Sequence, residues 1–124
     1  SRDVKLALRD DLAGLPLARL AELDDAAFRQ LFAITPVKRT GRDRFLRNVL
    51  IAIGNSGDAA LVPAILARLG DVSPLVRGMA VWALSRLDPA DFLLRADAAM
   101  ACEENASVLS EWRNALCQNP DGTL

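Results

Sequence analysis

The sequence predicts an all-α fold in which about six to seven helices stack as a repeat. Of 124 residues, 52% are hydrophobic and only 5% are aromatic, and Ala and Leu dominate the apolar class. Ala and Leu favour helices, whereas strands are rich in β-branched and aromatic residues. Apolar residues recur at helical spacing along most of the chain, between breaks that contain Pro and Gly. The length suits one domain with a buried core.

The first third of the chain is the least regular part. Residues 1–14 carry mixed charges without one clear period, so we expect a linker or edge helix there. A short helix is expected over 15–23, because Pro16 suits a first helical turn and leucines recur every three residues along one face. A second helix over about 26–33 can be capped by the aspartates before it, and it ends ahead of Pro36.

A basic loop follows, in which Gly41 permits a turn with positive φ. A longer helix is expected over about 43–54. Its apolar face would comprise Phe45, Leu46, Val49, Leu50 and Ile53. The Gly-Asn-Ser-Gly-Asp run after it combines a helix stop with an N-cap, so the next helix spans about 59–69.

Three further helices complete the predicted domain, which spans 15–118. The first begins with Ser-Pro at 73–74, a cap followed by a first helical residue, and runs to about residue 86. The second begins with Asp-Pro at 88–89 and runs to about residue 101. The last helix spans about 104–117, and the polar residues 119–124 form a frayed tail.

Positive charge is concentrated in one stretch, residues 38–47, which holds five cations against a single acid, Asp43. The cations are Lys38, Arg39, Arg42, Arg44 and Arg47. The net charge of the chain is −1, so the rest of the molecule is acidic. Local potential, rather than net charge, attracts a polyanion, and this stretch is therefore the candidate nucleic-acid contact.

Several classes of site are absent from the sequence. There is no His, so the usual general base and the commonest metal ligand are missing. Cys102 and Cys117 have no CxxC spacing and cannot form a zinc site alone; we expect two small buried residues or one exposed thiol. No apolar run approaches the ~20 residues of a membrane span. Trp82 and Trp112 lie among core positions, which favours packing over base stacking.

An internal repeat supports the stacked architecture. Residues 47–58 can be overlaid on 77–88, with Arg on Arg and Asp on Asp. The segment 71–84, Asp-Val-Ser-Pro-Leu-Val-Arg-Gly-Met-Ala-Val-Trp-Ala-Leu, resembles the HEAT-repeat consensus. The resemblance implies a HEAT-like α-α superhelix in which Asp71 and Arg77 tie neighbouring repeats together. Arg47 occupies the same position in the first copy and can be a strut of the same kind.

A more specific resemblance covers residues 28–58, within which residues 38–58 read Lys-Arg-Thr-Gly-Arg-Asp-Arg-Phe-Leu-Arg-Asn-Val-Leu-Ile-Ala-Ile-Gly-Asn-Ser-Gly-Asp. This stretch resembles the C-terminal region of bacterial epoxyqueuosine reductases, and the resemblance weakens after about Leu87. Members of that family are cytoplasmic oxidoreductases that reduce epoxyqueuosine to queuosine in transfer RNA. The resemblance implies cobalamin and two four-iron, four-sulfur clusters, held by a catalytic domain and a ferredoxin-like domain that precede the HEAT-like region.

We therefore expect the chain to be an excised C-terminal domain without catalytic residues or cofactors of its own. Two cysteines are too few for even one such cluster. The expected partner is the anticodon arm of a transfer RNA, bound by cations and polar groups. The candidate contacts are Lys38, Arg39, Arg42, Arg44 and Asn48. The candidate structural residues of the repeat are Arg47, Asn55, Asp71 and Arg77.

Other hypotheses remain open at this point. The cations can belong to a solvated loop with no ligand. The domain can be a HEAT-repeat scaffold that docks proteins through its Leu- and Ala-rich faces, without nucleic acid. It can also be a DNA binder or a stand-alone enzyme, as some HEAT-like alkylpurine glycosylases are, although the missing His and the lack of clustered acids argue against independent catalysis.

Overall fold

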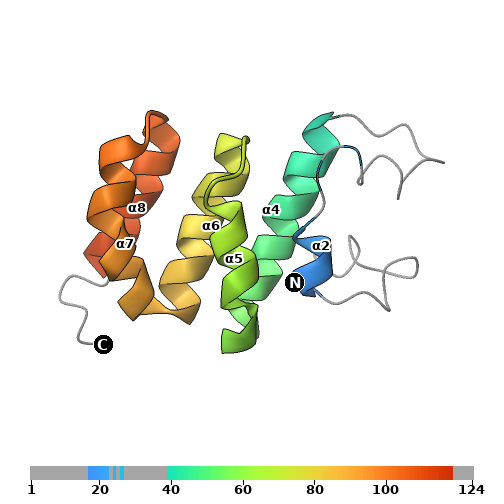
Figure 1. Ribbon diagram of the computed structural model, residues 1–124, viewed down its shortest axis with the longest axis horizontal. Coiled ribbons are helices and arrows are strands. Elements are labelled where there is room, and N and C mark those ends of the chain that lie inside the picture. The colour runs from blue at the N-terminus through green and yellow to red at the C-terminus, as the bar shows by residue number, and fades with distance from the viewer. Residues whose placement is uncertain (1–16, 23, 25, 27–38, 119–124) are drawn as a thin grey trace.

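The computed structural model describes residues 17–22, 24, 26 and 39–118, and every regular element in them is helical (Figure 1). The predicted all-α class is thus confirmed, whereas the finer HEAT-like superhelix stays a prediction. The elements are α2 (Leu17–Leu20), α4 (Arg39–Ser56), the 3₁₀ helix η2 (Ala59–Leu61), α5 (Val62–Arg68), α6 (Pro74–Leu87), α7 (Pro89–Cys102) and α8 (Ala106–Gln118). The predictions for 1–14, for most of 26–33 and for 119–124 lie outside the described residues.

The helices pack as two rows. In Figure 1, α4, α6 and α8 stand side by side in that order, and α5 and α7 lie in front of them. The contacts agree: α6 touches α4 and α8, while α5 packs on α6 and α7 packs on both α6 and α8. Since α5 and α7 run in the opposite direction, α4, α6 and α8 all begin at the same end of the stack. We call this edge the helix-start end.

The core lies around α6, which is apolar on most of its circumference. Such a pattern is typical of a helix enclosed by neighbours. Val76, Ala80, Ala83 and Leu84 are fully buried. The predicted apolar face of α4 is also buried, namely Phe45, Leu46, Val49, Leu50 and Ile53.

The two tryptophans differ in their burial. Trp112 on α8 is only 3% exposed, and its ring stacks on Phe92 of α7 with the centroids 5.2 Å apart. Its predicted core role is confirmed. Trp82 on α6 packs against the core but is half-buried, because one edge of its ring faces a surface depression.

Side-chain caps begin α6, α7 and α8. The Ser73 hydroxyl accepts the Val76 N–H, as predicted, and the Asp88 carboxylate caps α7 by accepting the Asp91 N–H. Asn105, which the sequence analysis did not single out, accepts the Ser107 and Val108 N–H groups at the start of α8. The caps satisfy N–H groups that have no partner inside a helix.

The start of α4 differs from the expectation. The helix begins at Arg39, earlier than predicted, and Gly41 lies within it. Among the described residues, only Gly57 has a positive φ, at 70°, so the predicted loop turn at Gly41 is wrong. Gly disfavours helices only weakly, and a tertiary contact made by the next residue, Arg42, overrides it.

Candidate nucleic-acid interface

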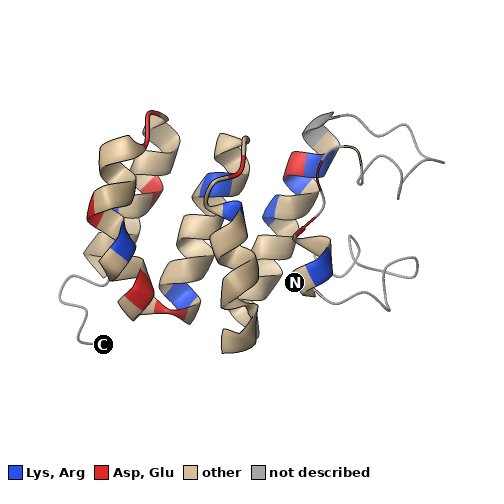
Figure 2. Cartoon of the chain, viewed as in Figure 1, with Lys and Arg blue, Asp and Glu red and all other residues tan. Residues whose placement is uncertain are grey.

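The helix-start end brings together most of the residues that the sequence singles out. Figure 2 shows charged residues there on α4, on the turn before α6 and on the turn before α8. Three helix starts at one edge also direct their positive dipole ends the same way, which favours anions. The side chains at this edge nevertheless divide into a buried set and an exposed set.

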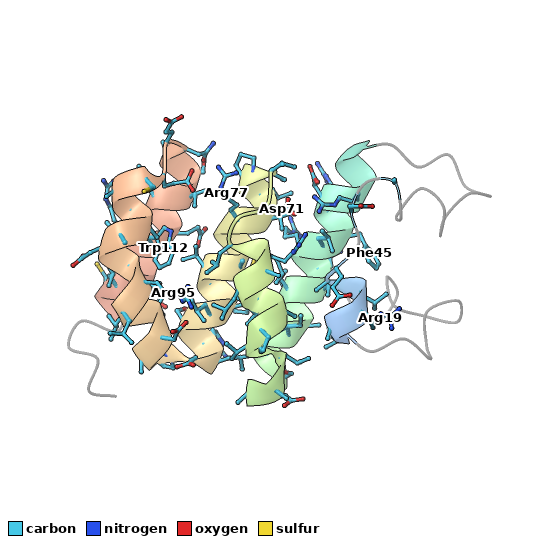
Figure 3. The ribbon with its side chains drawn as sticks, viewed as in Figure 1. Arg19, Phe45, Asp71, Arg77, Arg95 and Trp112 are labelled. Atoms are coloured by element: carbon cyan, nitrogen blue, oxygen red, sulfur yellow. The ribbon has the colours of Figure 1, made fainter. Side chains whose placement is uncertain are left out.

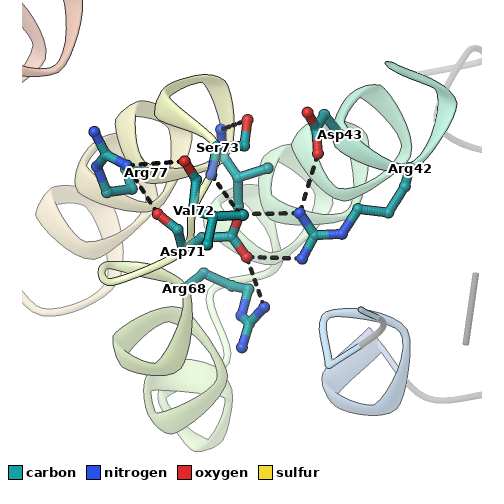
Figure 4. Close-up of polar contacts among 8 residues, drawn as sticks. Arg42, Asp43, Arg68, Asp71, Val72, Ser73 and Arg77 are labelled. Atoms are coloured by element: carbon teal, nitrogen blue, oxygen red, sulfur yellow. Dashed lines mark hydrogen bonds and ion pairs between the residues drawn. The ribbon is translucent and has the colours of Figure 1, made fainter. Parts of the chain in front are cut away.

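The buried set is centred on Asp71, in the turn between α5 and α6 (Figure 4). The Arg42 guanidinium of α4 donates two hydrogen bonds to its carboxylate, at 2.9 and 2.7 Å. Arg68 donates a third at 2.8 Å, and the Ser73 N–H a fourth at 3.0 Å. Arg42 also pairs with Asp43 at 3.0 Å. The Arg42 and Asp71 side chains are only 6% and 3% exposed, so this fork joins α4 to the next helix pair out of reach of water.

These contacts shift the pKa values of Arg42 and Asp71 so that the charged form of each group is favoured. Burial by itself would raise the pKa of Asp71, but the hydrogen bonds from Arg42 and from the Ser73 N–H outweigh it and hold the pKa below its ordinary value. The hydrogen bond to Asp71 raises the pKa of Arg42, against the opposing effect of burial. Arg42 therefore stays charged and engaged, and its role at this edge is to hold the helices together.

A second acid-centred contact lies at the next turn. Arg77 of α6 donates to both carboxylate oxygens of Glu103, at 3.1 and 2.9 Å, and to the carbonyl oxygen of Asp71 at 2.9 Å. Glu103 also accepts the Asn105 N–H. The hydrogen bonds from Arg77 lower the pKa of Glu103. Figure 3 places Arg77 and Asp71 close together at this end. Arg77 thus links the turns that precede α6 and α8, in line with the tie expected of it.

The exposed set lies on the other side of α4. Arg44 is exposed, and Arg47 and Asn48 are half-buried. Successive residues of a helix are about 100° apart, so Arg44 points nearly opposite to Arg42. The contact from Arg47 to Asn48 is long, 3.5 Å, and the buried Nε atom of Arg47 has no hydrogen-bond partner in the described part of the chain. Lys38 lies outside the described residues, and of Arg39 only the backbone, which begins α4, is described.

The turn after α4 is built without Asn55. The Ser56 hydroxyl donates to the Ile53 carbonyl and accepts the Asp58 N–H, Gly57 supplies the positive φ, and Asp58 accepts the Ala60 N–H. Asn55 is exposed, and within the residues the structure covers its amide has no hydrogen-bond partner. The structural role expected of Asn55 therefore rests on sequence pattern alone.

Three residues of these contacts were missed by the sequence analysis: Arg68, Glu103 and Asn105. A signal for two of them exists, because Asp71 and Ser73 recur as Glu103 and Asn105, an acid followed by a helix cap. Arg68 has a local signal, its spacing of three residues from Asp71. What no pattern shows is which arginine of α4 reaches Asp71.

The residues of this chain do not fit the iron–sulfur clusters that the resemblance implies. A four-iron cluster is held by four cysteines, and the chain has two. Cys102 ends α7 and Cys117 lies in the last turn of α8; both are exposed, whereas the sequence led us to expect two buried residues or one exposed thiol. In the part of the chain that the structure covers, no three His, Cys, Asp or Glu side chains gather as a metal site. The helices described there are too short or too polar to span a membrane.

Comparison with known proteins identifies similar sequences. The chain is 38% identical over 86 residues to the epoxyqueuosine reductase of Alicycliphilus denitrificans, covering 63% of this chain and 24% of that protein. It is 35% identical over 79 residues to that of Xanthomonas campestris, and 28% identical over 96 residues to that of Listeria monocytogenes. The Xanthomonas match covers 63% of this chain and 22% of the relative, and the Listeria match covers 77% of this chain and 25% of the relative.

No family model and no solved structure matches the chain. The chain spans about a quarter of the length of the relatives described above. The resemblance that residues 28–58 indicate is confirmed at this level: the chain is similar to a domain-sized part of the epoxyqueuosine reductases.

Proposed function

We propose that this chain is the C-terminal, HEAT-like, tRNA-recognising domain of an epoxyqueuosine reductase, and that it is not catalytic by itself. The observation that carries the proposal is the similarity to three proteins of that name. In this proposal, cobalamin and two four-iron clusters belong to catalytic and ferredoxin-like domains that precede it in the same cytoplasmic chain. Those domains reduce epoxyqueuosine to queuosine while this one holds the anticodon arm.

The exposed side of α4 supports the RNA-binding part of the proposal. Phosphates bind cations and helix N-termini, and Arg44 lies exposed near the start of an 18-residue helix. Arg47 and Asn48 follow on the same side, while Lys38 directly precedes α4 in the sequence and Arg39 is its first residue. Arg42 leaves the candidate set because its guanidinium is occupied by Asp71.

The proposal is tested by titrating the 124-residue chain into a labelled anticodon stem-loop RNA at several salt concentrations. We expect the Lys38→Ala/Arg39→Ala/Arg44→Ala variant to bind more weakly and to lower the slope of log K against log salt by about 2–3, since each phosphate contact contributes roughly 0.7–0.9. The matched control removes three cations elsewhere, at Arg19, Arg95 and Arg113. Failure of the parent to bind, or an equal loss in the control, would refute the proposal.

A second candidate, protein docking without nucleic acid, is favoured by exposed apolar side chains. Leu94 is 82% exposed and Val72 is 80% exposed. Leu94 borders a groove of about 540 Å³ that is lined mainly by α7 and α8, with Trp112 in its lining. The affinity of a protein docked through such apolar surfaces would change little with salt concentration, whereas the affinity of phosphate contacts falls steeply as salt increases. The salt series of the same titration therefore separates the two functions.

A further inference from the structure

One stripe of side chains runs the length of α4 on its exposed side. Arg44, Arg47, Asn48, Ile51 and Asn55 recur at intervals of three and four residues, which places them on one face of the helix. Their exposure agrees, because Arg44 and Asn55 are exposed and the other three are half-buried. The stripe therefore begins with cations at the helix-start end and ends with an amide at the far end of α4.

The far end of the stripe borders a shallow pocket of about 330 Å³. Ile51 and Asn55 of α4, Met79 and Trp82 of α6, and Glu111 of α8 line it. The pocket exists because α4 and α6 approach closely: the ring edge of Trp82 lies against Gly54, where a Cβ atom would overlap it. Arg86 lies over the Trp82 ring, 5.5 Å from its centroid, and is exposed.

The lining combines flat apolar surface with two polar groups of different kinds. Ile51, Met79 and the edge of Trp82 offer contact to a planar ring. The Asn55 amide can donate and accept, and the Glu111 carboxylate accepts from amino groups. That carboxylate repels phosphate, so the pocket suits an uncharged base. Arg47, one turn before Ile51 on α4, and Arg86, which lies over the Trp82 ring, can meet the phosphates that flank the base.

We infer that this pocket receives an unpaired nucleobase of the RNA whose phosphates are held at the helix-start end. The inference rests on the proposed function and adds to it a base-binding subsite at Asn55, Met79, Trp82 and Glu111. Stacking and base-edge hydrogen bonds do not depend on counterion release, so the subsite contributes affinity that salt barely changes.

The test compares two RNA hairpins with the same stem and the same number of phosphates. One has a normal unpaired loop, and the other has abasic sites throughout its loop. The variants are Asn55→Leu, which keeps the size of the side chain and removes its amide, and Glu111→Gln. Asn114→Leu, an exposed position of α8 outside the pocket, and Glu104→Gln are the matched controls.

We expect the parent to bind the abasic hairpin about 10-fold more weakly than the normal one. Asn55→Leu should lower affinity for the normal hairpin by a similar factor, leave the abasic affinity and the salt slope unchanged, and unfold at the parent's temperature. Equal losses on both hairpins, or none on either, would overturn the base pocket while leaving phosphate binding intact. A parent that binds neither hairpin would refute the proposed function, and the pocket with it.

Discussion

The α4–α6 and α6–α8 junctions are built from the same parts but differ in how far water reaches them. Each has an arginine fork on an acid in the turn before the second helix, and each has a glycine that admits a side chain from its neighbour. The first junction closes around Arg42 and Asp71, 6% and 3% exposed. The second leaves Arg77 and Glu103 at 20% and 12%.

The difference shows how the same type of contact can contribute unequally to stability at two places in the fold. A buried ion pair is costly to break from one side, because the remaining charge cannot return to water. When one partner of a partly exposed pair is removed, the remaining charge regains some hydration, so the pair contributes less to stability. We conclude that the α4–α6 junction fixes the position of the exposed stripe on α4, whereas the α6–α8 junction tolerates change.

The largest expected effect is the loss of the buried acid. Asp71→Ala leaves the Arg42 and Arg68 guanidinium groups without their shared carboxylate and should lower the free energy of unfolding by about 3–5 kcal/mol. Glu103→Ala should cost about 1–2 kcal/mol, because Arg77 keeps its carbonyl partners and is nearer water. Urea unfolding followed by circular dichroism measures both. Equal losses would abolish the distinction between the junctions.

Two glycines within α4 and α6 sharpen the comparison. Gly54→Ala places a methyl group on the rigid ring of Trp82 and should cost about 1–3 kcal/mol. Gly78→Ala meets only Cγ of Glu111, at 3.3 Å, and a flexible side chain can move aside. The better helix propensity of Ala, up to about 1 kcal/mol, should leave this variant at or above parental stability. Thermal unfolding would contradict the account if the two variants ranked in the opposite order.

Acid should weaken the first junction through Asp71. Its folded pKa is lowered, so the stabilisation is complete above the unfolded pKa of about 3.9 and is lost as the pH falls through the folded pKa. The unfolding free energy should therefore drop below about pH 4. Asp71→Asn, which has no such proton to bind, should show a shallower drop than the parent in urea titrations between neutral and acid pH. An unchanged pH profile would mean that the fork does not lower the pKa of Asp71 on folding.

The sequence predicts the helices of the second half well because their signals are local. Ser73, Asp88 and the apolar spacing set the limits of α6 and α7 nearly to the residue. The start of α4 could not be predicted in this way, because the Arg42–Asp71 fork, which joins residues 29 positions apart, holds Gly41 in the helix. Asp71 and Arg77 each contact a neighbouring helix or turn, and their role as ties between HEAT-like repeats stays a prediction.

In the candidate site, too, local sequence predicts some features, and tertiary packing decides the others. The cluster of cations at 38–47 is visible in the sequence, but its division into buried and exposed side chains is not. Arg42 and Arg44 stand two residues apart with equal charge, and only packing shows that one is buried and the other exposed. The repeat overlay assigns the strut to Arg47, whereas in the structure Arg42 reaches Asp71.

The most direct test of the account is the salt dependence of stem-loop binding by two matched variants, Arg42→Met and Arg44→Met. Each removes one cation, and both are measured at a temperature where circular dichroism shows them folded. We expect Arg44→Met to reduce the slope of log K against log salt by about 1, and Arg42→Met to leave it unchanged while lowering unfolding stability. A reduced slope for Arg42→Met together with a parental slope for Arg44→Met would contradict the division of the basic stretch into a buried strut and an exposed RNA contact.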